Sequence, residues 1–207
     1  MNILFERTRD IFTKNLRAYL ILNALYYGIL FVFMIYLNFD PTLRDAFVER
    51  YNTTFLRGAP ELAGKPFEFR QTLGTVFGTF NLNLLGSSYG EITFPSLIIP
   101  FAGVAIGLYR VAFIGMAFSP ANPTAAGIFL PHLPTLLLEG QAAILAMLGA
   151  YIHGRALIWP KTIGQKSRWK AFVEGVRQSG MMYLPITGVL LVAALYGFIE
   201  IALIAGQ

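Results

Sequence analysis

One long apolar run constrains this chain more than any other feature. Between residues 111 and 154 the only formal charge is Glu139, and the rest of the run is rich in Gly, Ala and large apolar residues. Such a run is too apolar for a small soluble domain, and it is long enough to cross a bilayer, which takes about 20 residues per helix. A lone carboxylate in lipid costs free energy unless something neutralises it. The sequence therefore predicts an integral membrane protein with a buried acid.

The composition agrees with this prediction and excludes several kinds of site. Of the 207 residues, 56% are hydrophobic and only 13% are charged, whereas soluble domains are about one-quarter charged. We expect one integral membrane domain over residues 1–207. Cysteine is absent, which excludes disulfides, thiol nucleophiles and cysteine metal sites. Two histidines cannot hold zinc without carboxylate help, and we expect no metal and no cofactor.

The net charge of +5 could suggest a nucleic-acid partner. The basic residues, however, flank the apolar segments instead of forming a separate basic region. Anionic lipid headgroups are the better partner for basic residues in such positions. We therefore predict membrane lipids, and no nucleic acid, as binding partners.

Hydropathy predicts an all-α polytopic bundle of about five transmembrane helices. The candidate spans are residues 18–37, 73–90, 94–118, 135–154 and 181–205. The second candidate is uncharged but mildly polar, so it is either a weak span or a re-entrant helix. Four prolines in residues 119–134 favour a folded connection before the fourth span.

Two polar segments lie between the spans. Residues 40–72 mix acids and bases and form the predicted extramembrane loop, with a short helix at 42–54. Residues 155–178 hold six basic residues and one acid, so they form the predicted basic cytoplasmic loop. The N-terminal tail is also basic. The tail and residues 155–178 both lie on the cytoplasmic side only if the chain crosses an odd number of times between residues 40 and 155, which is three when residues 73–90 count as a span. This bias favours five spans with a cytoplasmic N-terminus.

Glu139 lies beside a row of small residues in the fourth candidate span. Ala142, Ala146, Ala150 and Gly154 repeat every four residues, which is typical of a helix-packing face. Glu139 comes three residues before this row, so it should point to the protein interior. It is a buried carboxylate that fixes packing or a group that senses protons or binds an ion, with exposure to lipid as a third alternative.

Arg110 is the one basic residue well inside a candidate span. It follows Gly103 and Gly107 at helical spacing and so shares their predicted packing ridge. Glu200 holds a similar position in the last span. We expect an intramembrane ion pair between Arg110 and either Glu139 or Glu200, which is either a structural bridge or part of a relay.

Three further polar side chains are candidates. His132 lies between Pro131 and Pro134, seven residues before Glu139, and would share its face if the helix began early. Alternatively, His132 caps that helix. Asn81 and Asn83 in the weak span should bond across helices, on different sides. No phosphate loop, HExxH or GxSxG motif is present, so nothing argues for an enzyme.

The order of these features resembles the stage II sporulation protein M family (SpoIIM, DUF95) of integral membrane proteins. The likeness covers roughly residues 70–205, with Pro134 and Glu139 in the place of a Pro-His-Gly-x-x-Glu type motif. Thr135 and Leu136 stand where that motif has histidine and glycine, and a Pro-His pair occurs three residues earlier. Other matching elements are Asn81, Asn83, Gly103, Gly107, Gly115, Ala142, Ala146, Gly154 and Glu200.

The resemblance implies a non-enzymatic membrane protein, similar to one that anchors and localises cell-wall-degrading partners. We therefore expect a multi-pass scaffold or assembly protein of a protein complex in a bacterial or archaeal cytoplasmic (inner) membrane. Its expected partners are other membrane or envelope proteins, with a homo-oligomer left open. The alternative is a transporter or channel subunit in which Arg110, Glu139 and Glu200 line a polar path.

Overall fold

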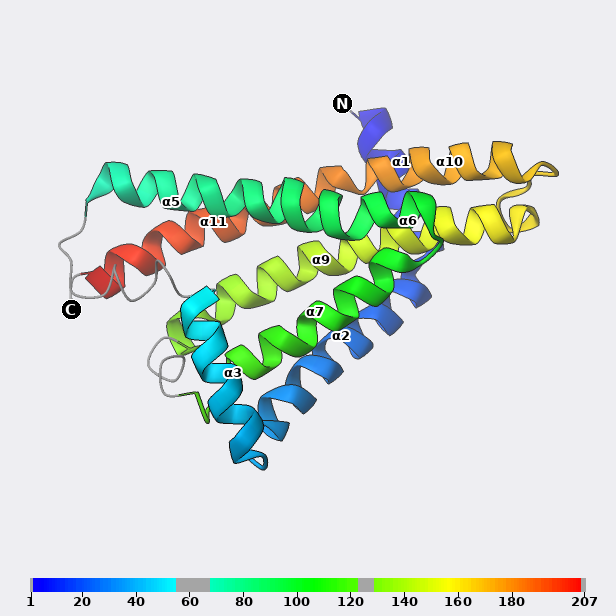
Figure 1. Cartoon of the computed structure of the whole chain (residues 1–207). Helices are drawn as coiled ribbons and strands as arrows, with labels where there is room; N and C mark the ends of the chain where they lie inside the picture. The colour runs from blue at the N-terminus through cyan, green and yellow to red at the C-terminus, as the bar shows by residue number, and fades with distance from the viewer. Residues whose placement is uncertain (1, 55–67, 123–128, 206–207) are drawn as a thin grey trace.

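The computed structural model describes residues 2–54, 68–122 and 129–205, and within these ranges every regular element is a helix (Figure 1). The all-α prediction is confirmed for this part of the chain. The helices are α1 (Asn2–Lys14), α2 (Leu16–Tyr36), α3 (Pro41–Thr54), α5 (Phe69–Asn81), η1 (Leu82–Thr93), α6 (Phe94–Ile98), α7 (Ala102–Ala117), α9 (Phe129–Ile158), η2 (Pro160–Ile163), α10 (Arg168–Met181) and α11 (Tyr183–Ala205).

Three helices are long and apolar enough to cross a membrane: Leu16–Tyr36, Phe129–Ile158 and Arg168–Ala202. They contain most or all of the first, fourth and fifth predicted spans. The helix α7 is also apolar but shorter. A membrane protein built as a helical bundle is therefore supported.

The predicted span at residues 94–118 is wrong in its boundaries, because the chain reverses inside it. Proline disfavours the helical conformation of the residue before it, and Ile99 before Pro100 is extended (φ −117°, ψ 111°). Phe101 then takes a left-handed conformation (φ 67°), and α7 begins at the next residue. Residues 94–98 are therefore the last part of a helical rod that precedes the reversal. Only α7 runs back in the opposite direction.

The weak candidate segment 73–90 belongs to that preceding rod. Helices α5, η1 and α6 follow one another without a gap from Phe69 to Ile98. Its middle part, η1, is a π-helix, and two side chains fit its wider turn: Ser88 Oγ donates to the carbonyl of Asn83 at 2.8 Å, and Thr93 Oγ1 to that of Ser88 at 2.9 Å. Each bond spans five residues, as the backbone bonds of a π-helix do.

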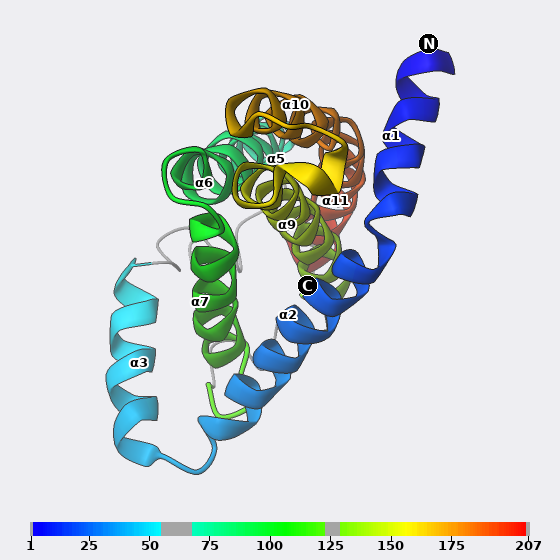
Figure 2. The ribbon, with the colours of Figure 1, turned by 90° about the vertical axis from the view of Figure 1, so that its right-hand side faces the viewer.

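The long helix α9 is the centre of the bundle (Figure 2), with α2, α6, α7, η1, α10 and α11 all packed against it. The row of small residues lies in this core: Ala142, Ala146 and Ala150 are at most 1% exposed. Gly154 is also buried, and a Cβ there would lie 3.0 Å from the ring of Phe101. The reversal after α6 thus docks on the C-terminal part of α9.

We predicted a folded connection over the proline-rich residues 119–134. Part of it is helical in the structure, because α9 already begins at Phe129. The first N–H groups of a helix have no partner within it, so Pro131 loses no helical bond. Pro134 lies inside the helix. Residues 123–128 are outside the described part of the chain.

The two polar segments are partly helical. Asp40 Oδ1 accepts a hydrogen bond from the backbone of Leu43 at 2.9 Å and so caps α3, close to the predicted 42–54 helix. Figure 2 shows α3 beside α7. Residues 55–67 lie outside the described residues. The predicted loop at 155–178 is mostly helical, because α9 continues to Ile158 and α10 begins at Arg168.

Candidate functional site

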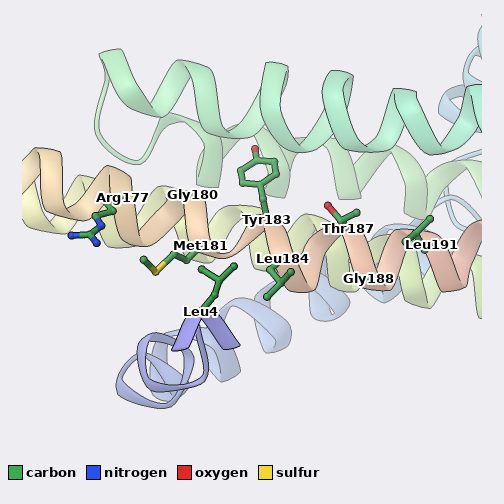
Figure 3. A pocket seen from close by; sticks show the side chains of 9 residues that line it. All are labelled: Leu4, Arg177, Gly180, Met181, Tyr183, Leu184, Thr187, Gly188 and Leu191. Carbon is green, nitrogen blue, oxygen red and sulfur yellow. The ribbon is translucent and has the colours of Figure 1, made fainter. Parts of the chain in front are cut away.

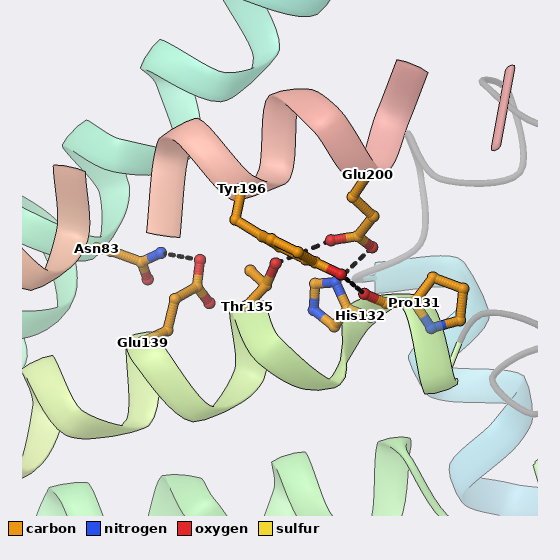
Figure 4. Close-up of polar contacts among 7 residues, drawn as sticks. All are labelled: Asn83, Pro131, His132, Thr135, Glu139, Tyr196 and Glu200. Carbon is orange, nitrogen blue, oxygen red and sulfur yellow. Dashed lines mark hydrogen bonds and ion pairs between the residues drawn. The ribbon is translucent and has the colours of Figure 1, made fainter. Parts of the chain in front are cut away.

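A cluster of polar side chains joins the N-terminal part of α9 to the C-terminal part of α11 (Figure 4). His132, Thr135 and Glu139 are spaced by three and four residues on α9, which places them on one helix face. The sequence predicted that His132 and Glu139 would share a face only if this helix began early. The helix begins at Phe129, so the two side chains do share a face. All three side chains point toward neighbouring helices in Figure 4.

Glu200 of α11 is held by α9 through both of its oxygens. His132 Nδ1 lies 2.9 Å from Oε1, and Thr135 Oγ1 donates to Oε2 at 2.8 Å. The Glu200 side chain is only 9% exposed. A buried carboxylate needs such partners, so these contacts both satisfy Glu200 and fasten α11 to α9.

Two more contacts extend the cluster. Asn83 Nδ2 of η1 donates to Glu139 Oε1 at 2.7 Å, and Tyr196 of α11 donates to the carbonyl of Pro131 at 3.0 Å. His132 also stacks on Phe118, with ring centroids 5.1 Å apart. Three helical rods therefore meet at this cluster, with Glu139 tied to one and His132 and Thr135 to another.

The expected pairing of Arg110 with Glu139 or Glu200 is corrected by the structure. Arg110 of α7 contacts Glu91 and Ser87, both on η1. The hairpin formed by η1, α6 and α7 brings these residues together, because the chain reverses at residues 99–101. Glu91 is the only charged residue between Arg70 and Arg110, and that charge pattern was the overlooked signal.

The two asparagines of the weak segment have different roles. Asn83 bonds across helices to Glu139, whereas Asn81 Nδ2 donates to the carbonyl of Phe77 in its own helix at 2.9 Å. The expectation of a cross-helix bond therefore fails for Asn81. A side chain that bonds back to its own helix can stay there without a partner helix.

The ridge of glycines on α7 lies at helix contacts. A Cβ at Gly103 would come within 1.8 Å of the Ile92 carbonyl oxygen, and one at Gly107 within 2.5 Å of Met147 Sδ. By contrast, no atom lies within 4 Å of a Cβ built at Gly74 or Gly78. Close helix approach at that second pair, which small residues permit, does not occur among the described residues.

A second polar cluster that sequence reasoning missed joins α2 to α9. Gln141 accepts from Tyr19 at 2.5 Å, and its Nε2 donates to Asn23 at 2.8 Å and to Tyr27 at 2.9 Å. The signal was present, because Tyr19, Asn23 and Tyr27 repeat every four residues on one face of α2. Gln141 is the hub of this contact.

The chemistry of both clusters is hydrogen bonding between helices. Among the described residues, no three His, Asp or Glu side chains converge in a way that could hold a metal ion. The groups that could move a proton are His132, Glu139 and Glu200, and each already has a partner on another helix.

Searches against protein-family models, curated proteins and solved structures found no match to this chain. The resemblance to the stage II sporulation protein M family therefore stays a prediction from sequence motifs.

Proposed function

We propose that this chain is a non-enzymatic scaffold of a bacterial or archaeal cytoplasmic membrane, which assembles with other membrane or envelope proteins. The observation that carries this proposal is the hydrogen bonding of the Glu200 carboxylate. Both of its oxygens are used to bind α9, so this intramembrane acid fixes one helix to another. A protein whose task is to hold partners in place needs such a fixed shape.

The proposal includes five crossings, with the N-terminus in the cytoplasm. One contact supports a shared basic end: Arg155 donates to Asn15 Oδ1 at 3.0 Å, and both residues lie next to the positively charged segments. At the opposite end, Ser119 Oγ donates to the Met34 carbonyl at 2.8 Å. The rods α2, α5–η1–α6, α7, α9 and α10–α11 then alternate in direction, as five crossings require.

The resemblance to the sporulation protein family supports the same function, since it implies an anchor for partner proteins. The competing function is a transporter or channel subunit. Its support is the π-helix next to Glu139, because π-helical turns are frequent at functional sites. Flux through the purified protein distinguishes the two functions.

The first experiment measures proton and ion flux in vesicles that contain only the purified protein. A scaffold gives no more flux than protein-free vesicles, and Glu139→Gln leaves this result unchanged. A transporter gives flux that Glu139→Gln abolishes and that Glu174→Gln, an acid of α10 outside the cluster, does not. Flux of that second kind would overturn the scaffold proposal.

The second experiment purifies the tagged protein from its native membrane and quantifies what accompanies it. The proposed external contact includes α3, where the Asp45 side chain is 72% exposed. Asp45→Lys should reduce recovery of the companions, whereas Lys166→Glu at the opposite end should not. A protein that is recovered alone from gently solubilised membrane would contradict a scaffold role.

A further inference from the structure

A groove runs between α1 and the joint of α10 with α11 (Figure 3). Its volume is about 560 Å³, within the range of roughly 300–1,000 Å³ found for small-ligand sites. Leu4 of α1 forms one wall, and Met181, Leu184 and Leu191 form the other. The interior is therefore mostly apolar.

Two glycines keep this groove hollow. No atom lies within 4 Å of a Cβ built at Gly180 or Gly188, so neither the helix nor a neighbour fills the space beside them. Leu184 and Leu191 flank Gly188 and are 46% and 51% exposed. In a helix apolar enough to span a membrane, such a surface suits a hydrocarbon chain.

A cation stands at one end of the groove. The Arg177 side chain is 59% exposed, and its ion pair with Glu174 is 3.8 Å long, beyond the 2.7–2.9 Å of a strong charge-assisted bond. Most of its five N–H donors therefore remain for a ligand. Basic residues outnumber acids on α1 and α10, which gives these helices a net positive charge: Arg7, Arg9, Lys14, Arg168, Lys170 and Arg177 stand against Glu6, Asp10 and Glu174.

The length of the groove matches one leaflet. Fourteen helical residues separate Arg177 from Leu191, or about 21 Å at 1.5 Å per residue. Half of a bilayer with its headgroups is about 20–22 Å. A headgroup at Arg177 would thus place the end of an acyl chain near Leu191.

We propose that this groove binds one anionic phospholipid. Its phosphate accepts hydrogen bonds from Arg177, and one acyl chain lies along Leu184, Gly188 and Leu191 under Leu4. The fork of guanidinium N–H groups fits phosphate oxygens, and the net positive charge of α1 and α10 favours an anionic headgroup over a zwitterionic one. The lipid ties α1 to the bundle.

The test measures lipid retention by native mass spectrometry of the full-length protein in detergent, titrated with phosphatidylglycerol or with phosphatidylcholine of the same chains. Wild-type protein should retain one phosphatidylglycerol and discriminate against phosphatidylcholine. Arg177→Gln should weaken phosphatidylglycerol binding about fivefold, the effect of one cationic side chain at an anionic surface. Lys170→Gln removes the same charge from the same helix, at a residue that does not line the groove, so it is the matched control and should weaken binding by much less than Arg177→Gln does.

A second variant tests the apolar part of the site. A Cβ at Gly188 would have no atom of the bundle within 4 Å, and the rest of a leucine side chain would take up groove volume, so Gly188→Leu should fold and yet lose the bound lipid. Equal binding by Arg177→Gln and Lys170→Gln, or undiminished binding by Gly188→Leu, would overturn the proposal. So would a dimer of wild-type protein that Gly188→Leu dissociates, because a second copy would then occupy this face.

Discussion

Two pairs of glycines, Gly103/Gly107 on α7 and Gly74/Gly78 on α5, have the same spacing in the sequence and opposite surroundings in the structure. At Gly103 and Gly107 an added Cβ would collide with η1 and α9, whereas at Gly74 and Gly78 it would meet nothing. The helix α7 lies between other rods, and this face of α5 has no described neighbour. A small-residue motif thus shows where a helix can be approached, but not whether it is.

The sharpest test of this contrast is Gly103→Ala. The clash is with the backbone carbonyl of Ile92 in η1, 1.8 Å from the new Cβ. The start of α7 is also held to α6 by the bond from Gly103 N to Ser96 Oγ at 2.6 Å, so it cannot move away without losing that bond. We expect a loss of about 3 kcal/mol or more in the free energy of unfolding, at the upper end for overpacking. Denaturant unfolding in mixed micelles measures it, and a loss below that of Gly107→Ala would contradict the geometry.

The next largest effect is expected for Gly115→Ala. Here the added Cβ would lie 2.4 Å from the Leu30 carbonyl oxygen of α2. Two whole helices can move apart by a small amount, so we expect a loss of about 2 kcal/mol, within the usual range for overpacking. The same unfolding assay applies, and a cross-link between α2 and α7 should form more slowly in the variant. An unchanged cross-linking rate would mean that the helices do not separate.

A smaller effect is expected for Gly107→Ala, although the contact is short. The atom that it meets is Met147 Sδ at 2.5 Å, and a flexible methionine can repack. We expect a loss of about 1 kcal/mol. In a Met147→Ala background the same change should be nearly neutral, because the clashing atom is gone. A double-mutant cycle with no coupling would show that Met147 is not the cause.

The smallest change in the free energy of unfolding is expected at Gly74 and Gly78, where an added Cβ meets no atom. Gly78→Ala removes backbone freedom from the unfolded chain and meets no atom, so it should be neutral or stabilise by up to about 1 kcal/mol. The variant serves as the control for Gly103→Ala in the purified protein. A clear destabilisation would break the comparison, because it would require a neighbour at Gly78 in the folded chain.

Much of the fold could be predicted from local patterns. Apolar length predicted α2, α9 and α11, and the row from Ala142 to Gly154 predicted the buried face of α9, because burial repeats with the helical period. The reversal at residues 99–101 was missed. Pro100 and the left-handed Phe101 after it turn the chain back, and a continuous apolar segment over residues 94–118 gives no sign of this turn.

The candidate site was predictable in its members but not in its pairs. Glu139, Glu200 and His132 stand out because ionisable groups are rare in apolar segments. Arg110 was expected to bind one of the two acids, and it binds Glu91 instead. Glu91 is the only charged residue between Arg70 and Arg110, which was a sequence signal for this pair, but the pair forms only because the chain reverses between the two residues.

The sequence by itself determined that this chain has helices long and apolar enough to cross a membrane, that its described part is helical, and which face of α9 is buried. These properties are sums over single residues or depend on neighbours within one helix, so they can be evaluated locally. Only the tertiary structure decided which polar groups pair and which glycines are covered. Lipid and protein interior are equally apolar, so hydrophobicity does not select one helix neighbour over another, and close packing and hydrogen-bond geometry make that selection.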